Sequence, residues 1–127
     1  MLKDNNNNNI LVIDDSSTNL VLLEAILVER GYIIQTALSV KEAFSIMNKL
    51  KPDLILLDLL MPRINGYDFL NEIKADKKFM NIPVVVISAV ANPEHIQKAI
   101  KLGADQFVTK PVDIPKICSI VDSYFNK

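Results

Sequence analysis

The sequence predicts an α/β fold, a five-stranded parallel sheet with helices on both faces. Apolar runs alternate five times with segments of helical period, and repeated strand-helix units joined by right-handed crossovers build such a sheet. Several of the runs are apolar at every position, which is typical of strands that are covered on both faces. A length of 127 residues fits one domain with one core.

The expected strands are short apolar runs that end in polar or turn-forming residues. All of them are much shorter than the roughly 20 apolar residues that a membrane-spanning helix requires, so no membrane segment is expected. The runs are ILVI at 10–13, YIIQTA at 32–37, LILL at 54–57, VVVI at 84–87 and QFVT at 106–109.

Five helices are expected to follow these strands. Gly31 is placed as a C-terminal stop for the first helix, and Ser39 with Glu42 forms a capping-box pattern at the start of the second. Asp113 is the expected N-cap of the fifth helix, which carries Pro115 in its first turn. The expected helices cover about 18–30, 39–50, 67–74, 94–102 and 114–125.

The first nine residues, MLKDNNNNN, are expected to be a disordered Asn-rich lead, because a polar tract cannot bury apolar surface. The domain is then expected to cover 10–127. The lead lacks the apolar stretch of a secretory signal, and the lone Cys118 cannot form an intramolecular disulfide. Both observations favour a cytoplasmic location.

The overall charge is nearly balanced. With 14 Lys and Arg residues against 15 Asp and Glu residues, the formal net charge is -1. Such a chain has no global field that attracts nucleic acid or an anionic membrane. Neither kind of partner is expected to bind it directly.

Polar side chains follow four of the expected strands. Asp14 and Asp15 follow the first, Asp58 the third, Ser88 the fourth and Lys110 the fifth. Because parallel strands bring their carboxyl ends to one edge of the sheet, we expect these side chains to meet there. Three carboxylates repel one another unless a cation lies among them, and hard oxygen ligands suit Mg²⁺ or Mn²⁺.

This arrangement predicts phosphoryl chemistry. Asp58, kept ionised by the metal, could attack phosphorus and form an acyl phosphate. The metal and Lys110 would neutralise the phosphoryl oxygens during transfer. Ser88 could donate a hydrogen bond to the new phosphoryl group.

These residues, in this order and at this spacing, resemble the receiver domain of two-component response regulators. The shared motifs are IDD after the first strand, DLLMP with Gly66 further on, ISA after the fourth strand and TKP after the fifth. The resemblance covers about 10–124. It implies a flavodoxin-like (βα)5 fold, Mg²⁺ as the cofactor, a downstream protein target, and a phosphohistidine on a sensor histidine kinase or histidine phosphotransfer protein as the donor.

The resemblance also implies a role for each matched position. Asp58 would be the phosphoacceptor. Phosphorylation would change the surface formed by the fourth helix, fifth strand and fifth helix, and this surface would control a partner or a phosphorylation-dependent dimer. The other implied roles are Mg²⁺ ligands for Asp14, Asp15 and the backbone carbonyl of Leu60, switch hydroxyl for Ser88, switch aromatic for Phe107, and phosphate contact for Lys110, with a cis Lys110-Pro111 bond.

Three other functions compete with this interpretation. A Mg²⁺-dependent phosphohydrolase with an aspartyl-phosphate intermediate uses similar chemistry, but it would usually have a substrate-covering cap and a general acid where Leu60 stands. A flavodoxin-like mononucleotide binder would have a Ser/Thr/Gly-rich loop in place of the acidic DDSSTN. A degenerate receiver acting only as an interaction surface is disfavoured because every chemical position is filled.

We therefore expect a signalling switch that assists its own phosphorylation and dephosphorylation, and not an enzyme. The sequence is compatible with a stand-alone regulator and with a receiver module of a larger protein. His95 does not match the donor histidine of the partner and is expected to be a solvated surface residue.

Overall fold

The fold is built on a five-stranded parallel sheet, as predicted. The computed structural model describes residues 8–61, 64–89 and 92–125, apart from the side chains of 60, 61, 64 and 65. The strand order is β2-β1-β3-β6-β7, and each neighbouring pair is parallel. These strands are β1 (Asn9–Ile13), β2 (Ile33–Ala37), β3 (Leu54–Asp58), β6 (Val84–Ser88) and β7 (Gln106–Thr109).

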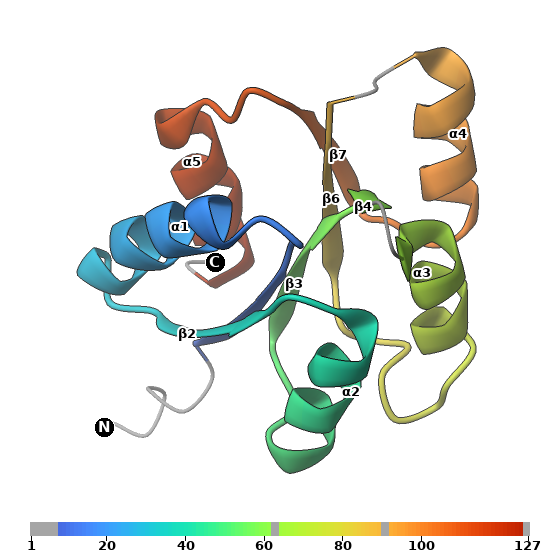
Figure 1. Cartoon of the computed structure of the whole chain (residues 1–127), viewed down its shortest axis with the longest axis horizontal. Helices are drawn as coiled ribbons and strands as arrows, with labels where there is room; N and C mark the ends of the chain where they lie inside the picture. The colour runs from blue at the N-terminus through green and yellow to red at the C-terminus, as the bar shows by residue number, and fades with distance from the viewer. Residues whose placement is uncertain (1–7, 62–63, 90–91, 126–127) are drawn as a thin grey trace.

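Helices cover both faces of this sheet (Figure 1). One face carries α1 (Ser17–Glu29) and α5 (Ile114–Phe125). The other carries α2 (Val40–Lys49), α3 (Gly66–Lys74) and α4 (Pro93–Lys101). In the part of the chain that the structure describes, no helix is long and apolar enough to cross a bilayer.

Successive residues of the central strands pack into two separate cores. Leu11 of β1 and Ile55 of β3 belong to the cluster under α2, α3 and α4. Their neighbours Val12 and Leu56 belong to the cluster under α1 and α5. Every residue of β1, β3 and β6 is buried, which is why these runs are apolar at nearly every position, whereas the edge strands β2 and β7 are partly exposed.

The helix ends confirm the predicted caps. The Ser39 hydroxyl accepts a hydrogen bond from the backbone N–H of Glu42 at 3.1 Å, and the Glu42 carboxylate accepts one from the backbone N–H of Leu38 at 2.6 Å. Gly31 after α1 and Gly103 after α4 have φ angles of 97° and 114°. This left-handed conformation favours glycine, which explains both stops.

The predicted start of the domain at residue 10 stays a prediction, and β1 begins one residue earlier, at Asn9. Asn9 is the first residue of β1 and is 7% exposed. Its backbone N–H donates to Oδ2 of Asp53 at 3.0 Å. A distant carboxylate therefore holds the last residue of the polar tract in the sheet, and composition cannot reveal such a partner; residues 1–7 of the expected lead lie outside the described residues.

Two further features differ from expectation. His95 is half-buried instead of solvated, because its Nδ1 shares a 2.5 Å hydrogen bond with the hydroxyl of Tyr67 on α3. A small antiparallel ribbon, β4 (Leu60–Met61) and β5 (Ile64–Asn65), joins β3 to α3. Strands of two residues have no hydrophobic period that a sequence could display.

Gly66 allows α3 to begin against the backbone that follows β3. A Cβ atom at this position would lie 2.5 Å from the carbonyl oxygen of Leu59 and 2.8 Å from its Cα. Both atoms belong to rigid backbone next to Asp58, so a side chain here would displace either the helix or the end of the strand. The glycine is required by this close approach.

We predict that Gly66→Ala destabilises the protein by about 1–3 kcal/mol, the usual cost of overpacking. Helix propensity alone gives the opposite sign, because alanine is favoured over glycine within a helix by about 1 kcal/mol. Urea unfolding of the two proteins separates these effects. A variant as stable as the native protein, or more stable, would contradict the close approach of α3 to Leu59.

Candidate functional site

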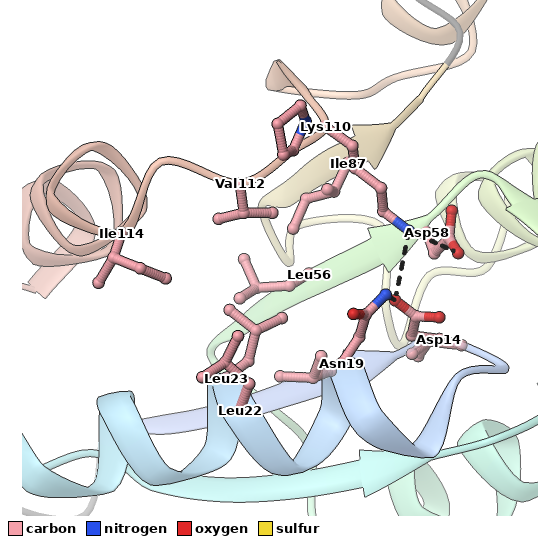
Figure 2. A pocket seen from close by; sticks show the side chains of 13 residues that line it. Asp14, Asn19, Leu22, Leu23, Leu56, Asp58, Ile87, Lys110, Val112 and Ile114 are labelled. Atoms are coloured by element: carbon pink, nitrogen blue, oxygen red, sulfur yellow. Dashed lines mark hydrogen bonds and ion pairs between the residues drawn. The ribbon is translucent and has the colours of Figure 1, made fainter.

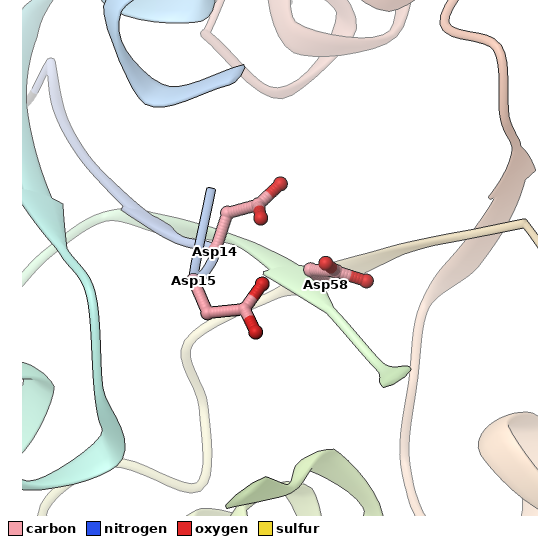
Figure 3. Close-up of side chains that lie close together, drawn as sticks. All are labelled: Asp14, Asp15 and Asp58. Atoms are coloured by element: carbon pink, nitrogen blue, oxygen red, sulfur yellow. The ribbon is translucent and has the colours of Figure 1, made fainter. Parts of the chain in front are cut away.

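Three predicted carboxylates meet where the order of strands reverses. β1 lies between β2 and β3, so the chain leaves β1 in one direction and returns on its other side at β3. Asp14 follows β1 directly and Asp58 ends β3; both are buried, with 4% and 6% exposure, whereas Asp15 is exposed. One oxygen atom from each of the three lies within 4.8 Å of the others (Figure 3).

Asp14 is held in place by the start of α1. Its Oδ1 accepts a hydrogen bond from the backbone N–H of Ser16 at 2.9 Å, and its Oδ2 accepts one from the side-chain amide of Asn19 at 3.3 Å. Ser16 is also the N-cap of α1, because its hydroxyl accepts from the backbone N–H of Asn19. Asn19 was not identified from the sequence. Its position in the first turn of the helix that follows Asp14 was the signal that could have identified it.

Lys110 lies between the two buried acids. Its Nζ donates to Oδ2 of Asp58 at 3.2 Å and lies 3.6 Å from Oδ2 of Asp14 (Figure 2). Its backbone N–H donates to the carbonyl oxygen of Ser88 at 2.9 Å, which ties the end of β7 to the end of β6. The Lys110-Pro111 peptide bond is cis, as the resemblance implied.

The site has more negative charge than its lysine balances. Burial, and next the charge of Asp14, raise the pKa of Asp58 from 3.8 to about 6, although Lys110 acts in the opposite direction. A cation among the three carboxylates would remove this imbalance. Oxygen ligands gathered at these distances fit a hard divalent cation such as Mg²⁺.

The remaining predicted residues lie around this cluster. Ser88 ends β6 and is fully buried, one position beyond Ile87, the partner of Asp58 in the sheet. Phe107 on β7 is half-buried and packs against the core under α2, α3 and α4. Leu60 begins β4, two positions after Asp58, and the role of its carbonyl group stays a prediction.

Comparison with known proteins agrees with this architecture. The family model of the response regulator receiver domain matches residues 10–122. The signal receiver domain of a signal transduction histidine kinase from Syntrophus aciditrophicus is 31% identical, with a TM-score of 0.84 over 93% of this chain and 89% of that one. The chemotaxis protein CheY4 of Vibrio cholerae is 23% identical, with a TM-score of 0.86 over 91% of this chain and 97% of that one, and shows the fold alone.

A curated relative is much longer than this chain. A probable cyclic di-GMP phosphodiesterase of Vibrio cholerae serotype O1 is 40% identical over 93 residues, which are 73% of this chain and 21% of the relative. The chain thus spans about a fifth of that protein. The family match covers nearly all of the described residues, and on this ground the chain belongs to the response regulator receiver domains, the signalling switches of two-component systems.

Proposed function

We propose that Asp58 is the phosphoacceptor of this receiver and that Lys110 and Ser88 assist the transfer. The observation that supports the proposal most strongly is the position of Asp58, a buried carboxylate 3.2 Å from the Lys110 ammonium group, in a cluster of three carboxylates. A buried acid with a raised pKa and a specific charged partner is typical of a functional site.

The proposed donor is a phosphohistidine on a sensor histidine kinase or a histidine phosphotransfer protein. A carboxylate oxygen of Asp58 forms a bond to phosphorus while the bond from phosphorus to the donor nitrogen breaks, and the imidazole keeps the electron pair. Lys110, already hydrogen-bonded to Asp58, then offsets charge on the phosphoryl oxygens.

Mg²⁺ is the cofactor that we propose for this site. Asp14, Asp15, Asp58 and the backbone carbonyl of Leu60 would hold it. When bound, it supplies positive charge to the phosphoryl group during transfer. The hydrogen bonds that Asp14 accepts from Ser16 and Asn19 keep one metal-facing carboxylate in a fixed orientation, so less ordering is needed on binding.

We further propose that the phosphoryl group is read out on the face formed by α4, β7 and α5. Ser88 would donate a hydrogen bond to it, and Phe107 would move inward behind Ser88. The backbone bond between Ser88 and Lys110 supports this coupling, because it joins the two strand ends that carry these residues. The altered face would bind a downstream protein or support a phosphorylation-dependent dimer.

The cellular setting belongs to the same proposal. The absence of direct contact with nucleic acid or membrane accords with the net charge of -1. A cytoplasmic location and a protein partner complete the proposal. The chain would assist its own phosphorylation and dephosphorylation, either alone or as a module of a larger protein.

Incubation with acetyl phosphate and Mg²⁺ is expected to add one phosphoryl group to the native chain, measured as intact-protein mass. Asp58→Asn should abolish the adduct because the amide is not a nucleophile toward phosphorus. Asp68→Asn, which changes an exposed aspartate in the first turn of α3, is the matched control and should retain it.

Removal of the metal with EDTA should also abolish the adduct. An adduct that persists in Asp58→Asn would exclude Asp58 as the acceptor. One that persists in EDTA would exclude the metal requirement. If the folded native chain acquires no adduct, a cognate kinase becomes the necessary donor, and a failure with that donor would refute the proposed function.

The charge imbalance generates a further prediction. Asp58→Asn should stabilise the metal-free protein at about pH 7.5 by on the order of 2 kcal/mol, since it removes a carboxylate whose folded-state pKa, about 6, exceeds its ordinary value of 3.8. Because a raised acid pKa disfavours the folded state only when the acid is ionised, the gain should largely disappear as the pH falls toward about 4.

Urea unfolding in EDTA at both pH values measures this difference. Excess Mg²⁺ near neutral pH should reduce the gain, because a bound cation stabilises the native protein and not the variant. An equal gain in the free energy of unfolding at both pH values, or a loss near neutral pH, would contradict the excess of negative charge at the site.

A further inference from the structure

An apolar cavity of about 250 Å³ opens beside the carboxylate cluster (Figure 2). It lies between α1 and the segment that joins β7 to α5, with the buried strand residue Leu56 among its walls. Asp58 and Lys110 line one end. The proposed phosphoryl chemistry takes place at that charged end and gives no role to the rest of the cavity.

The rest of the cavity is apolar and can be reached from solvent. Leu22 and Leu23 of α1 line one side, and Val112 and Ile114 line the other. Leu22 is 52% exposed, and Val112 and Ile114 are half-buried, so the rim is open without any unfolding. A cavity of about 150 Å³ with similar walls holds a benzene molecule, so this one has room for a six-membered ring.

We propose that this cavity receives the apolar part of a small phosphoryl donor, an acyl phosphate with an aromatic or branched acyl group. The inference rests on the proposed function and adds a donor class to it. One carboxylate oxygen of Asp58 bonds to phosphorus as the bond between phosphorus and the acyl oxygen breaks. The organic carboxylate leaves with the electron pair, beside the apolar walls.

The distribution of charge favours this occupant. Apart from Asp14, Asp58 and Lys110, all of which lie at one end, the described residues that line the cavity carry no formal charge. A ligand that fits must therefore combine one charged group with an uncharged, apolar body. An anionic phosphoryl group matches Lys110 and a divalent cation at the charged end, whereas the ring replaces water against leucine, valine and isoleucine side chains.

The test compares benzoyl phosphate with acetyl phosphate as donors for the purified chain with Mg²⁺, by the initial rate of adduct formation in intact-protein mass. The two donors differ in intrinsic reactivity, so the informative quantity is the change in their rate ratio between variants. Leu22→Asn alters the rim of the cavity. Val21→Asn is the matched control, because Val21 is the preceding residue of α1, 65% exposed, and does not line the cavity.

We expect Leu22→Asn to lower the ratio of benzoyl to acetyl rates about fivefold, since a ring buried against fewer apolar groups loses about 1 kcal/mol. Val21→Asn should leave the ratio unchanged and should accept acetyl phosphate at the native rate. If acetyl phosphate labels Asp58 but the ratio is the same in all three proteins, the inference is wrong and the proposed function stands.

A binding measurement decides the inference if neither donor labels the chain, an outcome that would count against the proposed function. Benzylphosphonate, which cannot transfer its phosphoryl group, should shift the methyl NMR signals of Leu22, Val112 and Ile114 in the presence of Mg²⁺. Methylphosphonate should leave these signals unshifted. Shifts with benzylamine but not with benzylphosphonate would overturn the proposal in favour of a cation site, and shifts with neither compound would show that the cavity takes no aromatic ligand.

Discussion

The burial of Asp58 next to Asp14 is the constraint on which the other features of the site depend. Two acids with 6% and 4% exposure share one lysine. Burial, and next the charge of Asp14, raise the pKa of Asp58 to about 6. The features around the two acids reduce the free-energy cost of burying them. Ser16 and Asn19 satisfy one acid, Lys110 bridges both, and the geometry leaves a place for a divalent cation.

The sheet can hold the two acids close together because a packed core restrains it on each face. β1 and β3, which deliver the acids, are interior strands of the sheet, and their residues are held between two separate cores. Close-packed interiors resist the displacement that repulsion between carboxylates would otherwise cause. Gly66 contributes to this packing, since its missing side chain lets α3 pack against the backbone next to Asp58.

The two faces of the sheet offer the site different surroundings. On the face of α1 and α5, Asp58 and Lys110 adjoin an apolar cavity with an open rim. On the other face, Phe107 of β7 packs with the core under α4. In our proposals a donor approaches from the first face, and the response appears on the surface formed by α4, β7 and α5.

The sequence by itself determined the fold class, the five parallel strands, the helices and the residues at the strand ends, because burial on both faces leaves uninterrupted apolar runs and caps leave local signatures. It could not determine the hydrogen-bond partners of Asn9 and His95, since Asn9 bonds to Asp53 and His95 to Tyr67, both far away in the chain. The β4-β5 ribbon and the cavity were likewise decided only by the tertiary structure. Distances between segments, and the charge and space that result from them, exist only after the chain has packed.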